Sequence, residues 1–119
     1  MARRRIDPAD GTLAVAAWRR DDEPPRSTIA TAVRFTLEEL AERAPGNSVE
    51  VRVPPLGVTQ CIEGPRHTRG TPPNVVETDP MTWIGLALGE QQWADAAAEG
   101  RILASGVRSN LSDLLPLRP

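Results

Sequence analysis

One short stretch of the sequence, residues 49–53, constrains the fold most. Valine occupies every second position of this stretch, and Glu50 and Arg52 stand between the valines. Because successive side chains of a strand point to opposite faces of its sheet, this alternation predicts a strand with one buried and one solvated face. Prolines and a glycine follow at 54–57, and we expect 58–63 to return as the antiparallel partner of a hairpin. Such a sheet needs helices to cover its apolar face.

Two amphipathic helices are expected ahead of this hairpin. The first begins at Asp7-Pro8, because an aspartate acceptor followed by proline is a common helix start, and it runs to about Arg20. The second runs from Ser27, its expected cap, to Ala44, since apolar residues recur there at the helical period. Its apolar stripe consists of Ile29, Val33, Leu37, Leu40 and Ala44.

Two further helices are expected in the C-terminal third of the chain. Asp79-Pro80 repeats the helix start, and Gly89 offers a left-handed stop after an apolar stripe that includes Trp83. Small residues from Trp93 onward then indicate a second short helix that ends at Gly100.

Two strands and a terminal helix complete the expected elements. A third strand is expected at 75–78, and a fourth at 101–105, where the apolar pattern changes to a period of two. Asn110 is expected to cap a last helix. The buried stripe of that helix would be Leu111, Leu114 and Leu115.

The order of these C-terminal elements resembles that of the sterol carrier protein family in its compact bacterial version. The matching pattern is a D-x-x-x-W helix at 79–83, a small-residue helix, the segment G-R-I-L-A-S-G at 100–106, and a terminal leucine helix. The resemblance implies a five-stranded sheet covered by helices with an apolar tunnel between them, whereas four strands can be counted from the residues. We therefore expect an α+β fold with a single mixed or antiparallel sheet of about five strands, covered by helices on one face.

Length, charge and cysteine content restrict the class of protein. A chain of 119 residues is expected to form a single domain over 1–119, with 1–6 as a flexible arm. A net charge of −2 argues against a nucleic-acid partner, which needs a concentrated positive surface. No run approaches the roughly 20 apolar residues of a membrane span, so no stable membrane insertion is expected. One cysteine, Cys61, excludes an internal disulfide and favours a cytoplasmic location.

The resemblance implies a carrier for a fatty acyl chain or a similar elongated apolar molecule, with no catalytic residue, no cofactor and no metal. Aromatic residues make up only 3% of the chain, so aliphatic walls suited to an alkyl chain are expected. The residues expected to line the tunnel are Leu37, Leu40, Val51, Ile62, Trp83, Leu86, Leu103, Leu114 and Leu115.

A polar loop at 65–74 offers a second candidate site. Arg66, His67 and Arg69 could hold a carboxylate, a phosphate or an acyl head group by charge-assisted hydrogen bonds near the tunnel entrance. The alternative interpretation is an exposed loop that its prolines make rigid.

Two other functions stay open at this point. Domains similar to the sterol carrier fold occur at the C-terminal end of mycothiol-dependent maleylpyruvate isomerases and of acetyltransferase-like enzymes. The chain could therefore be an accessory or interaction domain, with a filled core, that serves a partner protein or forms a homodimer. A small enzyme would need Cys61 as nucleophile and His67 as base, within hydrogen-bond distance of each other.

Overall fold

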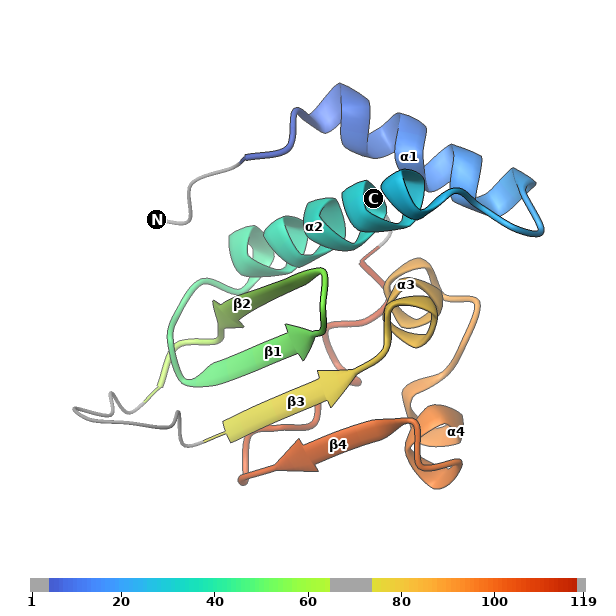
Figure 1. Ribbon diagram of the computed structural model, residues 1–119. Coiled ribbons are helices and arrows are strands. Elements are labelled where there is room, and N and C mark those ends of the chain that lie inside the picture. Colours follow the sequence, from blue (N-terminus) through green and yellow to red (C-terminus); the bar gives the residue numbers. More distant parts are fainter. Residues whose placement is uncertain (1–4, 65–73, 118–119) are drawn as a thin grey trace.

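The computed structural model describes residues 5–64 and 74–117. Helices and strands follow one another in runs along the described chain rather than alternating singly, as in an α+β fold (Figure 1). In chain order the elements are α1 (Pro8–Arg20), α2 (Arg26–Arg43), β1 (Val49–Val53), β2 (Gly57–Cys61), β3 (Asn74–Thr78), α3 (Pro80–Leu88), α4 (Trp93–Ala98) and β4 (Ile102–Ser105). The expected fold class is thereby confirmed.

The strands form one mixed sheet in the order β2-β1-β3-β4. β1 pairs antiparallel with β2 and parallel with β3, and β4 pairs antiparallel with β3. The described residues thus form a sheet of four strands rather than the expected five or so. The predicted hairpin is confirmed, since Val49 of β1 lies opposite Cys61 of β2 and Val53 lies opposite Gly57.

The two faces of the sheet differ in polarity, as the alternation in β1 predicted. The three valines of β1 are buried on the same face as Val76 of β3. Glu50, Arg52 and Glu77 are half-buried on the other face, where Arg52 Nε donates a hydrogen bond to Glu50 Oε2 at 2.6 Å. The core therefore lies on the valine face, between the sheet and the helices.

Helix α2 is the central element of the helical layer. It contacts β2 and α3, and α1 packs on it (Figure 1). Gly11 permits this packing, because a Cβ atom there would lie only 2.2 Å from ring atoms of Phe35 on α2. On the core side, Trp83 Nε1 of α3 donates to Thr36 Oγ1 of α2 at 2.8 Å, and both side chains are buried. This bond fixes the position of α2 relative to α3.

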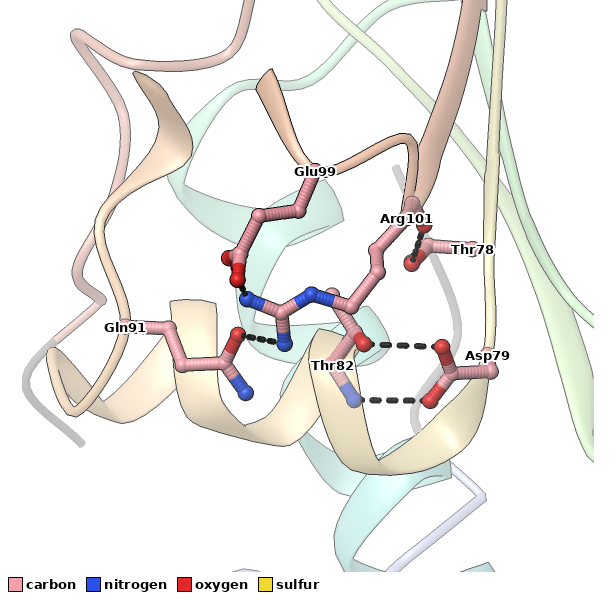
Figure 2. A network of polar contacts seen from close by, with 6 residues as sticks. All are labelled: Thr78, Asp79, Thr82, Gln91, Glu99 and Arg101. Atoms are coloured by element: carbon pink, nitrogen blue, oxygen red, sulfur yellow. Dashed lines mark hydrogen bonds and ion pairs between the residues drawn. The ribbon is translucent and has the colours of Figure 1, made fainter. Parts of the chain in front are cut away.

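Helix α3 has both of the predicted end signals. The Asp79 carboxylate accepts hydrogen bonds from Thr82 N at 2.9 Å and from Thr82 Oγ1 at 2.7 Å (Figure 2). Burial alone would raise the pKa of Asp79, but the hydrogen bonds from Thr82 and from backbone amides at the helix start together outweigh it, so the pKa lies below its usual value. Gly89 ends the helix with a left-handed φ of 83°.

Polar contacts of Arg101 connect the start of β4 to the neighbouring elements. Its guanidinium group donates to Gln91 Oε1 at 2.5 Å and also pairs with Glu99, as Figure 2 shows. Its carbonyl oxygen accepts from Thr78 Oγ1 at 2.7 Å. Side chains from the ends of β3, α3 and α4 therefore meet at one corner of the sheet.

The start of α2 differs from the prediction. Ser27 was expected to cap the helix, but the helix begins at Arg26 with Pro25 at the cap position and no side-chain cap hydrogen bond. Pro25 has a fixed φ, here −58°, and its carbonyl oxygen accepts the first bond of the helix from Ile29 N at 3.1 Å.

The predicted terminal helix is wrong. Residues 112–114 form a turn in which Leu114 N bonds to Leu111 O at 2.9 Å, and Asn110 Oδ1 accepts from Ser112 N. The interval before Pro116 is too short for a stable helix, since proline disfavours the helical conformation in the preceding residue. Leu117 instead bonds through its amide to Ala87 O at 2.8 Å, and the side chains of Leu111 and Leu117 enter the core.

Candidate ligand-binding groove

A groove of about 430 Å³ lies between one flank of α2 and the edge strand β2. In Figure 1 these two elements lie side by side, with α2 above β2. The apolar part of the lining comes from α2, β2, the hairpin turn and the N-terminal segment: Leu37, Ala41, Val58, Leu56 and Ile6. Arg5, Arg34, Glu38, Gly57 and Thr59 complete it.

A glycine lets the strand approach the helix at this groove. A Cβ atom at Gly57 would lie 3.0 Å from Cδ1 of Leu37 and 3.7 Å from Cγ of Arg34. The first distance is tighter than an ordinary van der Waals contact. The absence of a side chain at Gly57 therefore lets β2 lie close to Leu37 of α2.

The N-terminal segment is attached to α2 at the same groove. Arg5 N donates to Glu38 Oε2 at 3.0 Å, and Ile6 N donates to Glu38 Oε1 at 3.1 Å. Both carboxylate oxygens of Glu38 thus accept backbone amides. These bonds place the Ile6 side chain against the core cluster, so that it contributes to the groove wall.

A second apolar hollow of about 320 Å³ lies nearby at the start of α2. It shares Leu56 with the groove and is lined mainly by prolines and aliphatic residues: Pro24, Ile29, Pro55, Pro80 and Met81, together with Arg26. Leu56 is held in place by Arg34, whose Nε donates to Leu56 O at 2.9 Å. The hairpin turn thus adjoins both hollows.

The structure places most of the predicted tunnel residues in a closed core. Leu40, Val51, Trp83 and Leu86 are almost completely buried and belong to one hydrophobic cluster. Leu37 belongs to that cluster too, and it is the one predicted lining residue that also lines the groove. The wall of the groove at Leu37 therefore continues into the core.

Other predicted lining residues lie elsewhere. Leu103 is 67% exposed and lies opposite Glu77, on the polar face of the sheet, whereas its neighbour Ile102 enters the core. Strand alternation gives this separation, because only one of two consecutive side chains can face the helices. Leu114 and Leu115 pack half-buried in the C-terminal turn, against the core.

Ile62 follows β2 and is half-buried at the edge of the core. Its φ of 65° is left-handed, which is strained for a β-branched residue. The surrounding hydrogen bonds hold it there: Ile62 N donates to Ala44 O at 2.7 Å, and Ile62 O accepts from Ser48 N and Ser48 Oγ. Ile62 does not line the groove.

The predicted anion site and the catalytic alternative can be placed only in part. Arg66, His67 and Arg69 lie outside the described residues. Cys61 is completely buried on the core face of β2, and this burial raises the pKa of its thiol to about 11. The thiol is therefore protonated near neutral pH, which is unfavourable for a nucleophile. Among the residues that the structure describes, no cluster of His, Cys, Asp or Glu could hold a metal ion.

Sequence analysis missed several residues of the groove, namely Ile6, Arg34, Ala41, Leu56 and Gly57. Ala41 follows Leu37 by one helical turn, and this spacing was visible in the sequence. Ile6 and Leu56 lie outside regular elements, so no periodicity indicates their position.

The family comparison agrees with the observed architecture. Residues 25–117 match the model of a family described as bacterial SCP ortholog, where SCP denotes sterol carrier protein. The match covers most of the chain and includes every element from α2 to β4, whereas α1 lies outside it. A comparison with curated proteins found no match. In the described part of the chain, no helix combines the length and the apolar character needed to cross a membrane.

Proposed function

The chain belongs to the bacterial sterol carrier protein family, and from this premise we propose that it is a non-enzymatic carrier of an elongated apolar molecule, such as a fatty acyl chain. The observation that supports this proposal is the groove between α2 and β2. Its volume of about 430 Å³ falls within the range of small-molecule sites, and aliphatic side chains form much of its wall.

The proposed ligand lies between the helical layer and the sheet edge. Its chain would contact Leu37 and Ala41 on α2 and Val58 on β2. Burying a methylene group gains about 0.8 kcal/mol, so ten enclosed carbons would gain about 8 kcal/mol before the loss of ligand entropy. Apolar contacts alone can therefore provide useful affinity. Leu37 and Leu40 of α2 share one hydrophobic cluster with Val51, Trp83 and Leu86, so deeper entry of the ligand would require α2 to move away from the sheet and from α3.

Two features of Cys61 support the remaining parts of the proposal. Its buried, protonated thiol argues for a binding role rather than covalent catalysis. Its unpaired state suits a reducing compartment, and we place the protein in the cytoplasm on that ground.

Native mass spectrometry of gently purified protein tests the proposal. Organic extraction would then identify any bound molecule, and competition against a fluorescent fatty acid would show whether it can be displaced. We expect about one displaceable lipid per chain. Protein that is empty and ignores the fluorescent probe, also after reloading of deliberately delipidated samples, would contradict a carrier role.

An accessory domain for a partner protein is the second candidate, and the polar face of the sheet favours it. The strand register aligns Val58, Arg52, Glu77 and Leu103 in one row across that face. The two aliphatic ends of the row are 59% and 67% exposed. A stable complex that is recovered without lipid and is lost in the variant Leu103→Glu would favour this function over a carrier.

A further inference from the structure

The charges of the groove differ from those of the chain as a whole. The protein carries a net charge of −2, yet the described charged residues at the groove are Arg5, Arg34 and a single acid, Glu38. Both oxygens of Glu38 accept the amides of Arg5 and Ile6. The groove therefore has an excess of positive charge next to an aliphatic wall.

Arg34 has donors to spare at this position. Its Nε donates to Leu56 O at 2.9 Å, and its terminal nitrogens form no ion pair with an acidic residue of the described chain. Guanidinium groups bind oxyanions in a bidentate manner through such a planar pair of N–H groups. The bond to Leu56 restricts the orientation of the plane, so part of the entropy of ordering this side chain is already lost before a ligand arrives.

The cationic and aliphatic parts of the groove are adjacent. Arg34 and Leu37 are three residues apart on α2, so they lie on the same face of the helix, and both line the groove. A molecule in the groove therefore meets an alkyl surface and a guanidinium group together. An amphiphile with one alkyl chain and one anionic end fits both.

We propose that Arg34 binds the oxyanion head group of a single-chain amphiphile, such as a carboxylate, while the alkyl chain lies against Leu37, Ala41 and Val58. Arg5 adds a second positive charge at the same groove. This inference rests on the proposed carrier function and adds a preference for anionic over neutral ligands. The residues of this site differ from Arg66, His67 and Arg69 of the predicted anion site, which lie outside the described residues.

Calorimetric titrations with decanoate and with decan-1-ol test the inference, because the two ligands share a chain length and differ in the charge of the head. The wild-type protein should bind decanoate more tightly than decan-1-ol. Arg34→Gln should weaken decanoate binding about tenfold, since it removes charge-assisted hydrogen bonds to the carboxylate from a side chain that is partly solvated. Decan-1-ol binding should change less than about twofold. Arg34→Lys keeps the positive charge but not the planar pair of N–H donors, so its affinity for decanoate should lie between those of wild type and Arg34→Gln.

Arg43→Gln is the matched control, because Arg43 lies on the same helix but does not line the groove. It should leave both affinities unchanged. An equal loss for decanoate and decan-1-ol in Arg34→Gln would overturn the head-group role and leave the carrier function standing. Acetate or inorganic phosphate that binds wild type as tightly as decanoate would also overturn it, because the site would then be one for free anions. A wild-type protein that binds neither ten-carbon ligand would overturn both proposals.

Discussion

The titration of the Cys61 thiol tests how completely the core is shielded from water at the edge strand β2. The side chain is completely buried at the end of β2, and burial raises the pKa of its thiol from the usual 9.0 to about 11. All fourteen basic residues are arginine and the chain has no tyrosine, so Cys61 is the one side chain that titrates between pH 9 and 11. A pH dependence of stability in this window can be assigned to it.

The sign follows from proton binding. Between pH 9 and 11 the folded state keeps the thiol proton while the unfolded state has lost it, so the free energy of unfolding falls as pH rises. The stabilising contribution is complete below pH 9 and disappears as pH passes through the folded pKa. With one pKa unit equal to 1.36 kcal/mol, the loss should reach about 1.4 kcal/mol at pH 10 and about 2 kcal/mol at pH 11.

Urea unfolding at pH 8, 9, 10 and 11 under reducing conditions measures this loss. Cys61→Ala serves as the control, because it changes the absolute stability at every pH but has no thiol to titrate. Its stability should be flat above pH 9. If wild type and Cys61→Ala show the same slope above pH 9, Cys61 is not desolvated as described.

Two further predictions concern α2 and the groove. Thr36→Val removes the acceptor of the buried Trp83 indole and should lower the free energy of unfolding by about 1–3 kcal/mol. In a Trp83→Phe background no indole donor is left unpaired, so the same substitution should lower it by less than about 1 kcal/mol. Chemical denaturation of the four proteins measures the difference, and equal costs in both backgrounds would contradict the role of this bond. Gly57→Ala places a methyl group 3.0 Å from Leu37 Cδ1 and should reduce the affinity for decan-1-ol about fourfold, the equivalent of one methylene contact, as measured by calorimetry. Unchanged affinity in a folded variant would show that the ligand does not lie against Leu37 beside Gly57.

Local signals in the sequence predicted the regular elements well where they were complete. The alternation at 49–53 correctly predicted a strand with one buried face, and α3 begins after Asp79 and ends at Gly89 as expected. Where a signal was incomplete the prediction failed. Ser27 follows prolines that already start the helix, and Pro116 leaves too little chain for a terminal helix.

The candidate site was harder to predict because it is made by tertiary contacts. Leu37 was expected to bind ligand and lines the groove, but Ile6 reaches it only through the bonds of its segment to Glu38. Gly57 was interpreted as part of a turn, and its effect on the distance between β2 and α2 depends on how the two pack. Leu103 illustrates the remaining limit, since alternation separates it from Ile102 without indicating which of them faces the helices.

The strand order also has a consequence for the kinetics of folding. β1 lies between β2, which a tight turn connects to it, and β3, which is parallel to it and far along the chain. Closing the short turn costs little entropy, whereas β3 must be brought back over a longer segment before any of its contacts form. We therefore expect the hairpin to form first and to serve as the template on which β3 and then β4 assemble. Pulse-labelled hydrogen exchange should protect the amides shared by β1 and β2 before those shared by β1 and β3, and the reverse order would refute this sequence of events.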